Sequence, residues 1–378
     1  MRSRRLPPLR SLLAPAGWAT AALLLGTGWA AAEPQMRALL VGVSDYPKET
    51  VGDLQLAGPK NDVALMIDTL GRIGVPAKNV TVLADGLETT TATRPADGMP
   101  TRAAILAALD DLAAKSGPGD FVLVHLSGHG SQQPIADPSR HAVAKADGLE
   151  EIFLPIDIGT WEDSVGAVKN ALVDHELGRA VTAIRAKGAR VWVVIDACHS
   201  GTMTRAGGDA VAKQVPPSVL HIPEAALARA KAAEAERRDK SAATRGRAGG
   251  ARPTGAGWGF GAIFGTAAKP VPPAPTPVAA PAPAPVAPAT PSPTPVATMP
   301  PASAPAPVPA SAPASKPATA AVEPGGYVAF FAAWPDQVAL QKALPRGYGA
   351  GERRPHGVLT FYLARALREG RVSTFRDV

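Results

Sequence analysis

A proline-rich tract limits how much of this chain can pack into a core. The chain has 378 residues and 40 prolines, and 20 of those prolines lie between Pro270 and Pro324. An alanine and proline tract of this composition buries no core and favours extended polyproline conformations. Residues 206–324 are therefore predicted to be an insertion, in which a charged, helix-prone stretch precedes the disordered tract. The packed part must come from residues 33–205 and 325–378.

The positive charge is concentrated outside the predicted folded part. The formal net charge is +7, and four arginines among the first ten residues contribute +4. Residues 224–252 hold eight Lys or Arg against four Asp or Glu, which adds another +4 and leaves −1 for the rest. A nearly neutral body gives no basis for binding nucleic acid.

The first 32 residues have the organisation of an export signal. Arginines precede an apolar run from about residue 12 to residue 29, and Ala30, Ala31 and Ala32 follow it. This order is typical of a cleaved signal peptide, although residues 11–32 are also long enough for a retained membrane anchor. We predict cleavage before Glu33, a periplasmic or secreted protein, and no stable membrane anchor after signal removal.

Short apolar runs alternate with segments of helical periodicity. The runs cover residues 38–43, 80–83, 121–126 and 191–195, and the helical segments cover 61–70, 101–114 and 171–186. This alternation predicts an α/β fold with a mostly parallel sheet flanked by helices. Residues 327–333 and 357–367 are predicted to be a further strand and helix. Two elements are too few for a separate core, so we expect them to complete the same sheet.

Reactive side chains follow two of the predicted strands. His129 lies in the sequence Ser-Gly-His-Gly-Ser at 127–131, and Cys198, the single cysteine, lies in Asp-Ala-Cys-His-Ser-Gly at 196–201. The carboxyl ends of parallel strands meet at one edge of a sheet, where ligands bind. A neighbouring imidazole can deprotonate a thiol, and flanking glycines leave N–H groups free to bind an oxyanion. The pattern predicts a cysteine nucleophile with a histidine base.

Other interpretations of these residues are less consistent with their positions. A lone cysteine is often a small buried hydrophobic residue, but Cys198 directly follows a buried strand. The His199 side chain diverges from its neighbour Cys198, so we assign it a structural role, and His125 lies inside a strand as a core residue. A zinc site has no third or fourth ligand at usable spacing. Ser127 and Ser131 do not lie in the Gly-x-Ser-x-Gly motif of serine hydrolases.

Taken together, the motifs resemble those of the metacaspase-like branch of caspase-fold cysteine peptidases. The resemblance rests on His-Leu-Ser-Gly-His-Gly at 125–130 and Asp-Ala-Cys-His-Ser-Gly at 196–201. The segments 56–62 and 147–157 and the helix beginning at 357 support it. It covers about 37–205 and 325–370 and omits the insertion. It implies His129 as general base, Cys198 as nucleophile, and an oxyanion hole from the N–H groups of Gly130 and Cys198.

The resemblance also implies a polypeptide substrate with Arg or Lys at the cleavage site. The acidic pocket residues of the family fall on Asp62 and Asp196, with Ser127 beside them. A guanidinium or ammonium group entering a pocket needs a carboxylate partner. The exposed basic residues of 224–252 could then serve as sites of self-cleavage, with a merely soluble linker as the alternative.

Many members of the family are activated by calcium, and Asp174 matches one of their aspartates. His175 and Arg205 stand where further aspartates would be expected, and a calcium ion takes six to eight oxygen ligands. We therefore expect no required cofactor, with calcium at Asp174 as the alternative.

The sequence as a whole predicts an exported cysteine endopeptidase. The alternative is a non-catalytic caspase-fold scaffold or envelope-interaction protein that acts through its Pro-rich loop. The presence of both Cys198 and His129 favours the enzyme. An adhesion or peptidoglycan-associated protein is disfavoured because no repeat or wall-binding module is visible.

Overall fold

The computed structural model describes seven stretches of the chain. The predicted signal peptide, most of the insertion, His199 and Arg205 lie outside them. No helix within these stretches is long and apolar enough to cross a membrane. The described residues are 33–88, 94–137, 147–198, 210–246, 322–333, 337–345 and 353–370.

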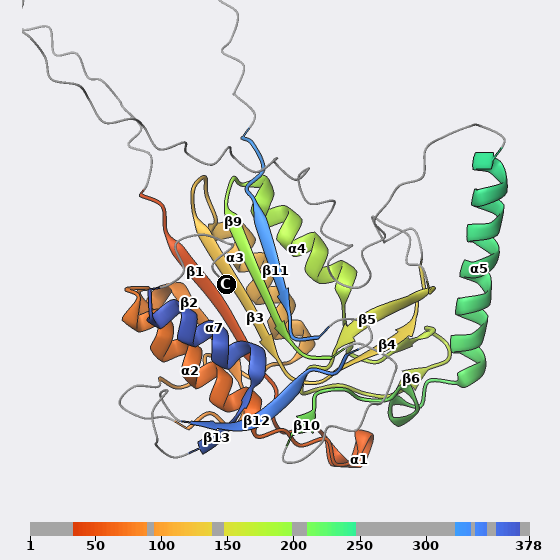
Figure 1. Ribbon diagram of the computed structural model, residues 1–378, viewed down its shortest axis with the longest axis horizontal. Helices are drawn as coiled ribbons and strands as arrows, with labels where there is room; N and C mark the ends of the chain where they lie inside the picture. The colour runs from red at the N-terminus through yellow and green to blue at the C-terminus, as the bar shows by residue number, and fades with distance from the viewer. Residues whose placement is uncertain are drawn as a thin grey trace, which may run out of the picture. The chain divides into compact units, whose positions relative to one another are not determined.

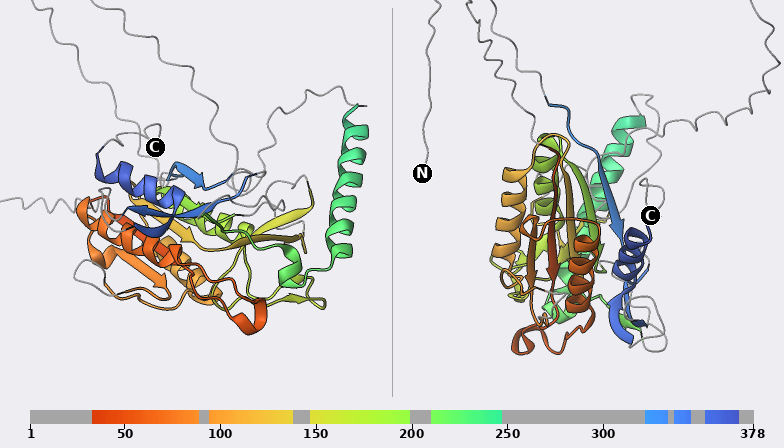
Figure 2. Two further views of the ribbon diagram at one scale, coloured as in Figure 1. Left: turned by 60° about the horizontal axis from the view of Figure 1, so that its bottom comes forward. Right: turned by 90° about the vertical axis from the view of Figure 1, so that its left-hand side faces the viewer.

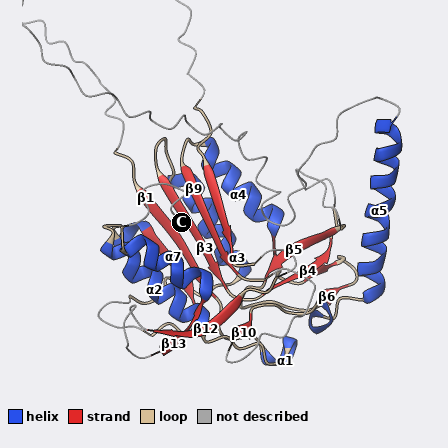
Figure 3. Ribbon diagram, viewed as in Figure 1, coloured by secondary structure: helices blue, strands red, loops and turns tan. Residues whose placement is uncertain are grey.

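The centre of the fold is a five-stranded sheet in which every neighbouring pair is parallel. The strand order is β11-β9-β3-β1-β2, as Figures 1 and 3 show. The predicted α/β class and mostly parallel sheet are confirmed. The strands are β1 (Met36–Gly42), β2 (Val80–Ala84), β3 (Phe121–Ser127), β9 (Arg190–Asp196) and β11 (Tyr327–Phe331).

Helices cover both faces of this sheet (Figure 2). Alternate side chains of a strand point to opposite faces, and β1 illustrates the result. Leu39 and Val41 pack into a core with α3 (Arg102–Lys115) and α4 (Asp174–Ala186). Ala38 and Leu40 pack into a second core with α2 (Gly58–Arg72) and α7 (Val358–Arg368). Burial on both faces explains why the strands appear as continuous apolar runs.

The residues after the proline-rich tract complete the sheet, as expected. β11 lies parallel to β9, with Tyr327 opposite Val191, and α7 packs beside α2. β11 is half-buried along its whole length, although its apolar sequence resembles that of the fully buried inner strands. The reason is its place at the edge of the sheet, where it has a neighbour on one side only.

A second, antiparallel sheet lies near the carboxyl ends of the central strands (Figure 1). The sequence analysis did not anticipate it. It combines β10 (Val211–Ala212), from the segment after Cys198, with β12 (Leu340–Pro345) and β13 (Arg353–Gly357). The last two strands belong to residues 325–378, which we call the tail. The remaining strands are β4 (Gly130–Pro134), β5 (Leu149–Phe153), β8 (Leu172–Val173), β6 (Trp161–Glu162) and β7 (Ala167–Val168).

Three shorter elements and one long helix complete the described structure. They are α1 (Lys48–Val51), the 3-10 turns Ala77–Asn79 and Pro217–Leu220, and α5 (Glu224–Gly246). This last region was predicted to be a charged, helix-prone stretch. α5 is mostly exposed up to residue 240, but Ala226 and Glu234 are buried, because its first half lies against β4 and β5.

Candidate active site

The predicted nucleophile and base emerge from neighbouring strands at the same edge of the sheet. Ser127, the last residue of β3, pairs with Asp196, the last residue of β9. His129 and Cys198 each follow two residues later, and their exposed fractions are 4% and 1%. The parallel register therefore brings the two motifs to one place, as the sequence analysis expected from their positions after strands.

Two residues that the sequence analysis missed orient His129. The carbonyl oxygen of Leu54 lies 3.0 Å from Nε2 of His129, so Nε2 carries the proton and donates it to this bond. The backbone N–H of His129 donates to the Tyr46 hydroxyl oxygen at 2.8 Å, and that hydroxyl donates to the carbonyl of Leu154. In this tautomer Nδ1 is unprotonated and can accept a proton. No sequence motif marks Leu54 or Tyr46, because one acts through its backbone and the other lies in a loop.

Burial keeps the imidazole of His129 uncharged near neutral pH. It lowers the pKa of His129 from its ordinary value of 6.5 to about 4, although the backbone groups of Lys213 and Leu54 favour the charged ring. Burial also lowers the pKa of His125 to about 4. This residue is fully buried, and its Nε2 lies 2.9 Å from the hydroxyl oxygen of Thr360. His125 is thus a core residue, as predicted, and His129 is in the form that a general base requires.

These two buried imidazoles predict a loss of stability on acidification. Because their folded-state pKa lies below the unfolded value, unfolding takes up protons between about pH 6.5 and pH 4. We expect the melting temperature of a Cys198→Ala protein to fall across this window as the pH is lowered. His125→Asn should remove part of that slope. A melting temperature that stayed constant from pH 6.5 to 4.5 would contradict the burial of neutral rings.

The N–H groups predicted for the oxyanion hole both point at one carbonyl group of the chain itself. The N–H of Gly130 donates to the carbonyl oxygen of Lys213 at 3.1 Å, and the N–H of Cys198 donates to the same oxygen at 3.4 Å. The neighbouring N–H of Val215 donates to the carbonyl of Gly130 at 2.9 Å, and the Ser131 hydroxyl donates to the carbonyl of Val215.

The segment 211–215 thus lies across the motifs as an extended peptide. Val211 and Ala212 pair with β12, and the N–H of Lys213 donates to the carbonyl of Ala339 at 3.0 Å. Backbone pairing of this kind is how an added strand binds at a sheet edge.

The side chain of Lys213 reaches the three predicted pocket residues. Its Nζ lies 2.9 Å from Oδ1 of Asp196, 3.0 Å from Oγ of Ser127 and 3.4 Å from Oδ2 of Asp62. It also donates to the backbone carbonyl of Asp196 at 3.0 Å. The structure therefore brings Asp62, Ser127 and Asp196 together, and we call these three residues the lysine-binding cluster. Lys213 and all three members of the cluster are 0% exposed.

Mutual attraction keeps this buried group charged. Burial favours the neutral form of Lys213, but Asp196 and Asp62 outweigh it and raise the pKa of the ammonium group. Burial likewise favours a protonated Asp62, but Lys213 and then His356 outweigh it and lower the pKa of that carboxyl. One cation between two carboxylates compensates much of the cost of removing these charges from water.

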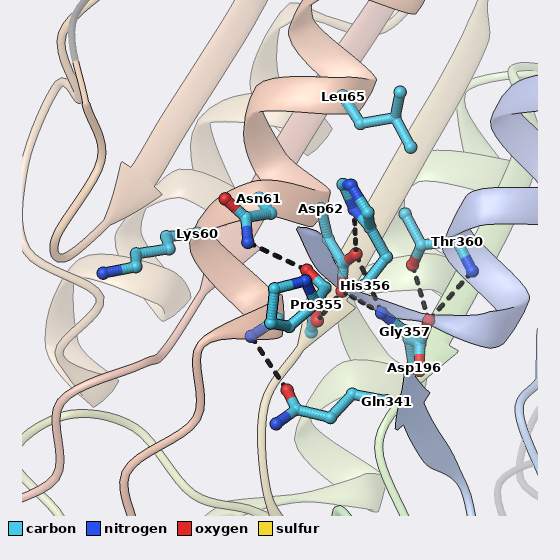
Figure 4. A network of polar contacts seen from close by, with 12 residues as sticks. Lys60, Asn61, Asp62, Leu65, Asp196, Gln341, Pro355, His356, Gly357 and Thr360 are labelled. Carbon is cyan, nitrogen blue, oxygen red and sulfur yellow. Dashed lines mark hydrogen bonds and ion pairs between the residues drawn. The ribbon is translucent and has the colours of Figure 1, made fainter. Parts of the chain in front are cut away.

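Residues from the tail hold the two carboxylates in place (Figure 4). Oδ1 of Asp62 accepts a hydrogen bond from the N–H of Gly357 at 3.0 Å and lies 3.2 Å from Nδ1 of His356. Oδ2 of Asp196 accepts from both the N–H and the hydroxyl of Thr360, at 2.9 and 2.7 Å. The sequence analysis missed these three tail residues, since nothing local in the tail indicates contact with residues far earlier in the chain.

A separate acidic group contains the predicted metal ligand Asp174. Within the described stretches, Glu150, Asp174 and His175 each offer one atom to a group spanning at most 4.8 Å, and all three are buried. Nδ1 of His175 lies 3.4 Å from Oε2 of Glu150. The group contains an imidazole nitrogen and two carboxylates, whereas calcium takes six to eight oxygens. The two carboxylates supply only part of the oxygen ligands that a calcium ion takes.

Comparison with known proteins shows which proteins the large portion is similar to. Residues 36–206 match the family model described as the peptidase C14 domain of metacaspases. Metacaspase-3 of Trypanosoma cruzi is 30% identical over 169 residues, which is 44% of this chain and 40% of that protein. Metacaspase-1A of Aspergillus oryzae is 30% identical over 167 residues, covering 44% of this chain and 34% of that protein.

A third relative carries a different description. The protein described as inactive metacaspase-4 of Trypanosoma brucei brucei is 31% identical over 169 residues, covering 44% of this chain and 41% of that protein. The chain thus spans well under half the length of the relatives compared here. Residues 36–206 of this chain are therefore similar to the peptidase C14 domain of metacaspases.

Proposed function

We propose that this protein is a cysteine endopeptidase that cleaves polypeptides after a basic residue. The proposal rests on two sets of contacts made by Lys213, one through its backbone carbonyl and one through its side chain. Its carbonyl oxygen accepts from Gly130 and Cys198 while its side chain ends in the lysine-binding cluster. A residue held in this way occupies the position of the substrate residue whose carbonyl carbon is attacked.

The proposed reaction uses the dyad and the two N–H groups. Nδ1 of His129 takes the proton of the Cys198 thiol, and the thiolate attacks the carbonyl carbon of the bound basic residue. The N–H groups of Gly130 and Cys198 stabilise the negative charge that develops on the carbonyl oxygen. The imidazolium then protonates the leaving amine as the C–N bond breaks, which leaves a thioester. Water, deprotonated by His129, hydrolyses the thioester and restores the thiol.

The chain itself supplies a candidate substrate. Lys213 lies outside residues 224–252, where self-cleavage was one of two alternatives, and its position supports a first cut between Lys213 and Gln214. Until that cut is made, segment 211–215 keeps other peptides out of the site. We therefore propose that the uncut chain is blocked by its own substrate-like segment.

Incubation of the full chain tests this proposal directly. We expect mass spectrometry of the incubated protein to reveal a new N-terminus at Gln214. The cut protein should then hydrolyse fluorogenic peptides ending in Lys or Arg and leave those ending in Asp intact. Cleavage after Asp alone would contradict the basic-residue assignment. Failure to hydrolyse any peptide, even after an added protease opens segment 211–215, would favour the alternative of a caspase-fold scaffold.

Cofactor use and location complete the proposal. The proposed chemistry employs a thiol and an imidazole, so activity should persist in a chelator such as EDTA, and activity that required added calcium would contradict it. The leader-like sequence at 1–32 supports export to the periplasm or the medium. Detection of mature protein beginning at Glu33 outside the cytoplasm would test that assignment.

A further inference from the structure

We propose that the lysine-binding cluster selects lysine over arginine at the cleavage site. This inference rests on the proposed function and narrows its substrate class. Three features carry it: the number of acceptors around the cation, the orientation of the carboxylate oxygens, and the space beyond the ammonium group.

Four acceptors surround the ammonium group, and the three nearest match its hydrogens in number. A lysine ammonium has three hydrogens to donate. Nζ of Lys213 has three acceptors at 2.9–3.0 Å, which are the side chain of Asp196, the backbone carbonyl of Asp196 and the hydroxyl of Ser127. Ser127 donates its own proton to Asp62 at 2.7 Å, so its oxygen faces the cation with a lone pair. Asp62, at 3.4 Å, supplies a second negative charge.

Neither carboxylate is free to accept the two-pronged hydrogen bonds of arginine. A guanidinium group binds best when both oxygens of one carboxylate accept from its parallel N–H groups. Oδ2 of Asp196 already accepts twice from Thr360 and is turned away toward the start of α7. Both oxygens of Asp62 accept from Gly357, and Oδ2 also accepts from Ser127. Each aspartate therefore offers the cation one oxygen. This arrangement suits the ammonium group of lysine, and it prevents arginine from making its paired hydrogen bonds to both oxygens of one carboxylate.

Gly357 closes the space beyond the ammonium group. A Cβ atom placed on Gly357 would lie 2.5 Å from Nζ of Lys213 and 2.1 Å from Oδ2 of Asp196. The backbone at 357 therefore lies close to the cation and forms a wall of its pocket. Arginine carries its terminal nitrogens about one bond length beyond the position of a lysine Nζ and spreads them sideways. With Lys213 fully buried, a guanidinium group would displace this wall or the hydroxyl of Ser127.

Thermal unfolding of a catalytically inactive protein tests whether the lysine-binding cluster can hold an arginine side chain. In a Cys198→Ala background, which keeps the segment uncut, Lys213→Arg is compared with Lys213→Met by thermal unfolding. Lys213→Met removes the charge at similar length and sets the scale for a lost cation. If the pocket rejects arginine, Lys213→Arg should lower the melting temperature by at least half as much as Lys213→Met. A Lys213→Arg protein that melts with its parent would overturn the inference.

A kinetic measurement tests selection among substrates. The self-cut protein is given two peptides that are identical except for Lys or Arg before the scissile bond. We expect kcat/KM to be at least tenfold higher for the Lys peptide. Ser127→Ala removes one ammonium acceptor and adds room, so it should reduce this ratio at least threefold. Equal or faster cleavage of the Arg peptide would overturn the inference and leave the proposed function standing.

The two measurements also separate the inference from the function on which it rests. If the chain neither cuts itself nor cleaves either peptide after an added protease has opened segment 211–215, the proposed function fails, and the melting temperatures still decide whether the cluster accepts arginine. If both peptides are cleaved at the same rate, the function stands and the selectivity fails.

Discussion

Replacing Cys198 with alanine is expected to abolish both self-cleavage after Lys213 and hydrolysis of basic peptides. The proposed reaction forms a thioester on this sulfur, so kcat/KM should fall by at least about a thousandfold. The measurement is release of a fluorogenic leaving group together with a denaturing gel of the incubated chain, which should show one uncut band.

A stability control makes this result specific to the chemistry. Cys198 is almost fully buried and its thiol, a weak donor, donates to the carbonyl of Gln337 at 3.4 Å, so its removal creates a small cavity at most. The melting temperature of the uncut variant should stay within a few degrees of that of uncut wild-type protein. Residual cleavage above about one part in a hundred would indicate a nucleophile other than Cys198.

Lys213→Met in the Cys198→Ala background is expected to destabilise the protein by about 3–5 kcal/mol, the usual cost of removing one partner from a buried ion pair. Asp62 and Asp196 are both fully buried, and Lys213 is the cation that lies between them. Without it, the carboxylates must take up protons or water, and segment 211–215 loses its side-chain anchor. Denaturant unfolding measures the loss, and limited proteolysis should detect release of the segment.

Two further variants identify the source of this loss. Adding Asp196→Asn to Lys213→Met removes one of the unpaired charges and should restore part of the stability. Lys342→Met, which replaces an exposed lysine on the neighbouring strand β12, should change the free energy of unfolding by less than about 0.5 kcal/mol. If Lys213→Met unfolded like Lys342→Met, the buried ion pairs would contribute nothing and the substrate-like docking of the segment would lose its support.

Much of the scaffold was predictable because its signals are local. A strand buried on both faces must be apolar throughout, so residues 38–43, 121–126 and 191–195 could be recognised without knowledge of their partners. Thr101 was predicted to begin a helix, and its hydroxyl accepts from the N–H of Ala104 at the start of α3. The placement of His129 and Cys198 followed from the same reasoning, since parallel strands bring their carboxyl ends together.

The short strands β10, β12 and β13 were not predictable in this way. β10 has two residues, and β13 reads Arg-Arg-Pro-His-Gly, a sequence with little strand propensity. The strand conformation of β10 depends on pairing with β12 across more than a hundred residues of chain, and β13 is held by pairing with β12 within the last part of the chain.

The contacts of the site were decided at the same long range. Sequence reasoning directed attention to residues 224–252 because basic residues are concentrated there, whereas Lys213 stands alone in its segment. What distinguishes Lys213 is contact with Asp62, 151 residues earlier, and what positions Asp62 is Gly357, 295 residues later.

The sequence by itself therefore determined the layered α/β scaffold and the two motifs at its edge, because periodicity and strand order act through neighbours in the chain. Only the tertiary structure decided that the chain's own Lys213 lies among Asp62, Ser127 and Asp196, with its carbonyl between Gly130 and Cys198. The physical reason is that a buried charge is stable only where its counter-charges converge. That convergence depends on how the whole chain folds, and the sequence around each charged residue does not indicate it.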